Sequence, residues 1–182
     1  MSELGFREGP FIFMDKMGID DVIGWSNTMY EAFGERFKAA SKLDILFEGA
    51  DKQLKNRKGF YSYYNDKKIV NKSIYKLLPF RKSREHFPKL EIQERLSFAI
   101  INEAVKCLED GIISGPRDGD IGAVIGIGFP SFLGGPFKFI DNLGIENTIK
   151  KLEFLTSKHD QLFVPSNLLQ DYLGQGKKFY DE

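Results

Sequence analysis

Few side chains in this sequence have the chemistry of a nucleophile or a metal ligand. The chain has one cysteine, Cys107, and two histidines, His86 and His159. Cys107 falls on an apolar helical stripe that includes Leu96, where a free thiol is typical of a packed core. Neither histidine has neighbours at the spacing of metal ligands. We therefore expect neither a catalytic thiol nor a metal site from these residues.

An aspartate in a repeated motif is the other conspicuous polar feature. Residues 9–19 read GPFIFMDKMGI and residues 135–145 read GPFKFIDNLGI, so both obey GPFxFxDxxGI, and a Gly-Phe pair precedes each copy. The motif places Asp15 and Asp141 at equivalent positions. A glycine turn followed by proline and an apolar run is typical of a helix start. A phosphate cradle is the alternative, but GxGxxG spacing after a strand and a P-loop lysine are both absent, which favours a structural turn.

The spacing of apolar residues predicts a mainly α fold around these motifs. Helices are expected over residues 20–37, 43–54, 91–110, 118–127, 147–158 and 166–172, and short strands over 60–64 and 67–70. Asp20 or Asp21 and Ser166 are the expected helix caps. The buried faces are expected from Val22, Met29, Tyr30, Phe33 and Phe37 in the first of these helices and from Ile92, Leu96, Ile100, Ala104 and Leu108 in the third. Gly122, Ala123 and Gly126 are small enough for close packing of the helix over 118–127 against another.

The repeat indicates two tandem related helical domains. We place the first over residues 1–70, a basic linker over 71–89 and the second over 90–182, which ends on KKFY as the first ends on KGFY. The second copy begins with two helices, over residues 91–127, that the first copy lacks. The first domain therefore reads as truncated at its N-terminus, and its remaining helices should expose apolar faces. We expect a fragment or a chain that self-associates.

Composition excludes several classes of partner. The formal net charge is zero and the isoelectric point is near 6.8, which disfavours nucleic acid as the main partner. A helix-turn-helix over residues 20–54 is also disfavoured, because Asp44, Glu48 and Asp51 would face phosphates. The basic linker is a solvated surface or, alternatively, a contact for the phosphates of an anionic substrate. No apolar run is long enough to predict a membrane-spanning segment, and the single cysteine suits a reducing compartment.

Five stretches of the chain resemble a known enzyme family. They are GFREGPFIFMDKMGID (5–20), GERFKAASKLDIL (34–46), NEAVKCLEDGI (102–112), GDIGAVIGIGFPSFLGGPFKFID (119–141) and GKKFYDE (176–182). The resemblance is to the C-terminal part of the multifunctional fatty-acid β-oxidation α subunit, in which an enoyl-CoA hydratase domain is fused to an L-3-hydroxyacyl-CoA dehydrogenase. In that family an NAD-binding Rossmann domain precedes two tandem helical domains.

The resemblance implies that the catalytic parts lie elsewhere. The family's His-Glu pair belongs to the Rossmann domain, to which nothing here corresponds. The family's asparagine stands nine residues before the glutamate of a Glu-Ala pair; in the second repeat that pair is Glu103-Ala104, and the position holds Glu94, followed by Arg95. The isolated chain is therefore expected to be inactive, although the parent oxidises L-3-hydroxyacyl-CoA to 3-ketoacyl-CoA with NAD.

The same resemblance gives the expected site residues and partners. Phe6, Pro10, Phe11 and Met14 are the expected substrate-binding residues, on one wall of the acyl-CoA cleft. The expected partners are the hydratase and Rossmann domains that this chain lacks and the thiolase β subunit of the complex. A bacterial cytoplasm is the expected location, with the mitochondrial matrix as the alternative. A stand-alone, non-catalytic helical module for assembly is the second interpretation of the chain.

Overall fold

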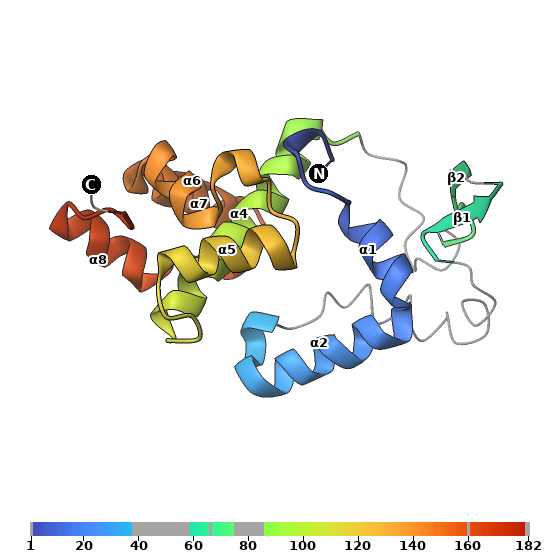
Figure 1. Cartoon of the computed structure of the whole chain (residues 1–182), viewed down its shortest axis with the longest axis horizontal. Coiled ribbons are helices and arrows are strands. Elements are labelled where there is room, and N and C mark those ends of the chain that lie inside the picture. Colours follow the sequence, from blue (N-terminus) through green and yellow to red (C-terminus); the bar gives the residue numbers. More distant parts are fainter. Residues whose placement is uncertain (1, 38–58, 66, 75–85, 160, 181–182) are drawn as a thin grey trace. The chain divides into compact units, whose positions relative to one another are not determined.

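The computed structural model describes residues 2–37, 59–65, 67–74, 86–159 and 161–180, and these are mainly helical (Figure 1). The predicted mainly α class is confirmed. Contacts divide the chain into two compact units: a larger unit of Met1–Arg7 with Phe87–Glu182, and a smaller unit of Glu8–His86. The domain boundaries at residues 70 and 90 and the tandem relation of the domains stay predictions. The predicted helix over 43–54, and most of the linker over 71–89, lie outside the described residues.

Helices α4 to α8 build the larger unit. Its elements are η1 (Ser2–Leu4), α4 (Lys89–Glu109), α5 (Pro116–Gly126), η5 (Ser131–Leu133), α6 (Pro136–Leu143), α7 (Ile145–Lys158), η6 (Gln161–Phe163) and α8 (Asn167–Gln175). Helix α4 packs against α5, α6, α7 and α8, and α5 also packs against α6. The core side chains with almost no exposed surface are Ile101, Val105, Phe137, Ile140, Leu152, Leu155 and Leu169. One hydrophobic cluster thus joins the five helices of this unit.

The second GPF motif starts α6 in the way the sequence predicts. Gly135 has a φ of 118° and Pro136 occupies the first helical position. A Cβ at residue 135 would lie 2.4 Å from the Asp120 carboxyl carbon, so the turn needs glycine for both its conformation and its space. Gly144, with a φ of 90°, ends α6 and directly precedes α7.

Helix α4 buries a different face from the one predicted. Its buried residues are Phe98, Ile101, Asn102 and Val105, whereas Ile92 is exposed. The other expected residues from Leu96 to Leu108 are only partly buried. Apolar residues recur at every third or fourth position of α4, so the periodicity predicts a wide apolar stripe along the helix but not which line of residues within it is buried most deeply. The helices that pack against α4, namely α6, α7 and α8, decide which line is buried.

The close helix approach at α5 also differs from the prediction. Cβ atoms built at Gly122 and Gly126 meet nothing within 4 Å, but one at Gly119 would lie 2.4 Å from the Phe137 ring. The prediction based on Gly122 and Gly126 was therefore wrong. The glycine that allows close packing lies one turn earlier, where α5 faces the buried start of α6.

The smaller unit contains α1 (Pro10–Met17), α2 (Ile19–Phe33), η2 (Gly34–Phe37) and a hairpin of β1 (Tyr61–Tyr64) and β2 (Lys67–Val70). The strands are antiparallel, with Tyr61 opposite Val70 and Tyr64 opposite Lys67. Neither helix has a buried residue, so the expected core helix over 20–37 is not a core helix. It ends at Phe33, and its cap is Gly18 rather than an aspartate.

Candidate functional site

Asp141 holds the C-terminal segment of the larger unit onto α6. Its Oδ1 accepts a hydrogen bond from the Phe179 amide at 3.0 Å, and its Oδ2 accepts one from the Tyr180 amide at 2.9 Å. The Phe179 ring then lies edge-on to Phe137, with ring centroids 4.9 Å apart. Both carboxylate oxygens of Asp141 are therefore used to fix the backbone.

Asp15 makes the same pair of contacts in the smaller unit. Its Oδ1 accepts from the Phe60 amide at 2.7 Å and its Oδ2 from the Tyr61 amide at 2.9 Å. Phe11 stacks on Phe60 with centroids 4.5 Å apart. The recurring aspartate is thus a structural clasp in both places. A carboxylate with both oxygens held by backbone amides is a poor candidate for a base or a nucleophile.

Asp120 is a third carboxylate, which sequence reasoning did not single out. It lies buried on α5, where Oδ1 accepts from the Phe137 amide at 2.7 Å and Oδ2 accepts from the Lys138 amide at 3.1 Å and the Tyr180 hydroxyl at 2.7 Å. It caps the N-terminus of α6 from a neighbouring helix, where a negative charge is favourable. The available signal was weak, because Asp120 is one of two aspartates, with Asp118, that precede the apolar part of α5.

Burial is the main cause of the pKa shifts of Asp120 and Tyr180. Loss of solvent raises the pKa of Asp120 above its ordinary value, against the hydrogen bonds from Tyr180 and from the two amides. Burial, followed by the hydrogen bond to Asp120 and its charge, raises the pKa of Tyr180. The Tyr180 phenol therefore stays protonated and donates its hydrogen to Asp120 at neutral pH.

Asn102 joins α4 to the connection between α7 and α8. Its amide nitrogen donates to the carbonyls of Leu162 at 3.2 Å and Val164 at 2.8 Å, and its oxygen accepts from the Ser166 amide at 3.3 Å. The Ser166 hydroxyl bonds to Glu109 at 2.7 Å rather than capping α8 with its side chain. The buried side chains of Asn102 and Ser166 thus make hydrogen bonds that stabilise the fold.

The predicted substrate-binding residues fall in both units. Phe6 belongs to the larger unit, where its ring is buried and meets Phe129 edge-on at 5.3 Å. Pro10, Phe11 and Met14 lie on α1 in the smaller unit, and Phe11 is half-exposed. Their assignment to an acyl-CoA cleft stays a prediction.

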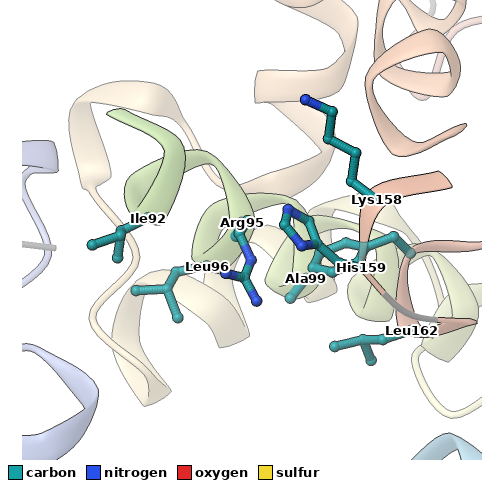
Figure 2. A pocket seen from close by; sticks show the side chains of 8 residues that line it. Ile92, Arg95, Leu96, Ala99, Lys158, His159 and Leu162 are labelled. Carbon is teal, nitrogen blue, oxygen red and sulfur yellow. The ribbon is translucent and has the colours of Figure 1, made fainter. Parts of the chain in front are cut away.

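A cavity of about 530 Å³ opens between the start of α4 and the end of α7. Its lining residues are Ile92, Arg95, Leu96, Ala99, Lys158, His159, Leu162 and Phe163. Figure 2 shows Arg95 among these side chains and Lys158 directed away from it. The Lys158 ammonium lies 4.5 Å from the centre of the Phe154 ring. The lining therefore combines apolar side chains with the Arg95 guanidinium and the His159 imidazole.

The position that the resemblance relates to the family's asparagine holds an ion pair. The carboxylate of Glu94 lies 2.7 Å from the Lys151 ammonium. A carboxylate accepts hydrogen bonds but cannot donate one as an amide does, so Glu94 cannot replace an asparagine amide.

Among the described residues, no group of three His, Cys, Asp or Glu side chains could hold a metal ion. No described helix combines the length and apolar character needed to cross a membrane.

Comparison with known proteins gives the family context. Residues 1–63 match the model for the C-terminal domain of 3-hydroxyacyl-CoA dehydrogenase. The chain is 44% identical over 181 residues to the fatty acid oxidation complex subunit alpha of Shewanella amazonensis, and 42% identical over 178 residues to that of Vibrio parahaemolyticus. Each alignment covers 98% of this chain, but only 26% and 25% of the relatives.

The chain matches the C-terminal part of fatty acid oxidation complex α subunits. The resemblance inferred from the sequence motifs is thereby confirmed. Because the chain spans about a quarter of the α subunits that it matches, the activity of the whole α subunit does not follow from the match.

Proposed function

We propose that this chain is the C-terminal helical portion of a β-oxidation α subunit whose dehydrogenase half oxidises L-3-hydroxyacyl-CoA to 3-ketoacyl-CoA with NAD. The alignment over 98% of the chain with fatty acid oxidation α subunits carries this proposal. The chain contributes residues that contact the acyl-CoA, for which Phe6, Pro10, Phe11 and Met14 are the candidates, and helices that support the dehydrogenase half. The bacterial source of these relatives favours a bacterial cytoplasm.

We propose that the chemistry of the dehydrogenase is supplied by another part of the α subunit. Hydride transfer needs a base beside the substrate hydroxyl and a cradle for the nicotinamide. Asp15, Asp120 and Asp141 are all committed to backbone amides, and Glu94 is paired with Lys151. The base and NAD therefore come with the Rossmann domain of an α subunit, and the chain alone is catalytically silent.

Comparison of the two GPF helices supports docking of further helices on the smaller unit. The Phe137 ring is completely buried, whereas the equivalent Phe11 is 48% exposed. The first amides of α6 donate to Asp120 of α5, but within the described part of the smaller unit no carboxylate accepts from the Phe11 amide. A helix from the dehydrogenase half that brings an acidic side chain to the start of α1 would satisfy both needs.

The test is a complementation assay with NADH and acetoacetyl-CoA. The 182-residue chain alone should consume no NADH and bind none in a titration. Addition of a separate polypeptide that carries the Rossmann domain of a related α subunit should restore turnover. Phe11→Ala should then raise the KM for acetoacetyl-CoA, whereas Ile125→Ala, at an 80% exposed position of α5, should leave it unchanged. Turnover by the chain alone would refute the proposal.

A stand-alone assembly module is the second candidate. It is favoured by the exposure of large apolar side chains in the smaller unit, among them Phe13, Trp25 and Tyr30, because such surfaces typically mark interfaces. The thiolase β subunit of the complex is the proposed partner. Analytical ultracentrifugation distinguishes the two candidates by the oligomeric state of the chain. If the chain self-associates and its oligomeric state does not change when the Rossmann polypeptide is added, the assembly module is supported. If the chain binds the Rossmann polypeptide in a one-to-one ratio, the dehydrogenase assignment is supported.

A further inference from the structure

We infer that the cavity between α4 and α7 is a binding site for a small amphipathic carboxylate, with an acidic head group at Arg95 and a hydrocarbon tail along the apolar lining. The inference rests on the chemistry of the cavity in the larger unit and is independent of the proposed function. The volume of about 530 Å³ lies within the range of about 300–1,000 Å³ that is typical of small-molecule sites.

Arg95 provides the recognition of a carboxylate. Its Nε is buried and has no hydrogen-bond partner in the described part of the chain. A buried donor without an acceptor is unfavourable because it has lost its hydrogen bond to water, so an incoming acceptor is favoured. A guanidinium offers adjacent N–H groups that match the two oxygens of a carboxylate. Figure 2 shows this side chain among the residues that line the cavity, which include His159 as well as apolar Leu96 and Ala99.

The other charged groups restrict the ligand to a single acidic head group. The Lys158 ammonium lies over Phe154, and the His159 Nε2 lies 3.8 Å from a Glu91 carboxylate oxygen. Glu91 would repel the several phosphates of a nucleotide or a coenzyme. One guanidinium near one carboxylate therefore suits a monoanion better than a polyanion.

The rest of the lining fits a hydrocarbon chain. Ile92, Leu96 and Leu162 contribute aliphatic surface, with Phe163 and Ala99 beside them. Ile92 is 44% exposed and Leu162 is 39% exposed in this structure. Covering such side chains with a ligand tail is favourable because it removes apolar surface from water.

Binding of decanoate to the full chain tests the inference. Isothermal titration calorimetry below the micellar concentration should show one saturable site, and decanol should bind at least tenfold more weakly because it lacks the charge. Amide chemical shifts should move at the start of α4 and the end of α7. Arg95→Gln should weaken decanoate binding about tenfold, whereas Arg117→Gln removes a positive charge at an exposed position of α5 and should change nothing.

A second variant keeps the test decisive if Arg95→Gln misfolds. Ala99→Leu adds volume to the lining without removing a charge, and it should weaken decanoate and decanol equally while far-ultraviolet circular dichroism stays unchanged. Equal binding of decanoate and decanol to the unmodified chain would overturn the inference. So would undiminished decanoate binding by a folded Arg95→Gln, or shifts confined to the smaller unit.

Discussion

Replacement of Asp120 is the strongest test of how the larger unit is held together. Asp120→Ala removes the acceptor for the Phe137 and Lys138 amides and the Tyr180 hydroxyl. Each buried donor left without a partner costs about 1–3 kcal/mol, and loss of the helix cap is included in that sum. Because the Lys138 amide and the Tyr180 hydroxyl are only partly buried, water will restore part of it. We expect a loss of about 4 kcal/mol.

This loss is a large part of the stability of a domain, which is typically about 5–15 kcal/mol. For a unit of this size, 1 kcal/mol lowers Tm by about 4 °C, so the melting transition of the larger unit should fall by roughly 15 °C. Urea unfolding followed by circular dichroism gives the free energy, and differential scanning calorimetry gives Tm. Glu153→Ala, at an exposed position of α7, is the matched control and should stay within about 0.5 kcal/mol of the parent.

If Asp120→Ala costs less than about 1 kcal/mol, the start of α6 does not depend on a carboxylate from α5. A second check comes from hydrogen exchange. The Phe137 amide should lose protection in Asp120→Ala before the amides in the middle of α4 do, because local opening at the start of α6 precedes global unfolding.

Three further predictions concern the pair Asp141 and Asp15, then Asn102, and finally Tyr180. Asp141→Ala should speed hydrogen exchange at the amides of Phe179 and Tyr180. Asp15→Ala should do the same at the amides of Phe60 and Tyr61. An effect in only one of the two variants would argue against equivalent roles for the two aspartates. Asn102→Ala leaves the carbonyls of Leu162 and Val164 and the Ser166 amide unpaired, so the free energy of unfolding should drop by about 2–4 kcal/mol in urea titrations, with Asn147→Ala on the exposed side of α7 as the control. The pKa of Tyr180 is raised in the folded chain. Its contribution to the free energy of unfolding is therefore complete below the ordinary tyrosine pKa near 10 and is lost as pH rises above that value. Tyr180→Phe should flatten the fall in stability above pH 10, and parallel stability curves for the two proteins would contradict this direction.

The local motifs could be predicted from the sequence because their signals are local. Proline at the first helical position and glycine on both sides define α1 and α6 whatever surrounds them. The strand pair also followed from a short aromatic run, a turn at Asn65 and a second extended run. The equivalence of Asp15 and Asp141 was visible as spacing, although only the backbone they meet shows what they do.

The predictions of burial and close helix packing that failed all depended on distant neighbours, whereas the predicted aspartate cap of α2 failed locally, because Gly18 takes that position. The helix over 20–37 has the periodicity of a core helix, but periodicity states only which residues share a face and not whether anything covers it. The same holds for α4, where the buried face is centred on Ile101 and Val105. Gly119 could not be separated from Gly122 and Gly126 by composition, since only the position of the Phe137 ring makes one of them necessary.

The sequence by itself therefore determined the helical class, the repeated Gly-Pro-Phe helix starts and the relation to β-oxidation α subunits, because these are encoded in contiguous residues. The tertiary structure decided which carboxylate caps which helix, which face of α4 is buried and where an arginine meets an apolar cavity. Asp120 meets the amides of residues 137 and 138, and Asn102 meets residues 162, 164 and 166. Contacts of such separation arise from helix packing, and no local spacing in the chain specifies them.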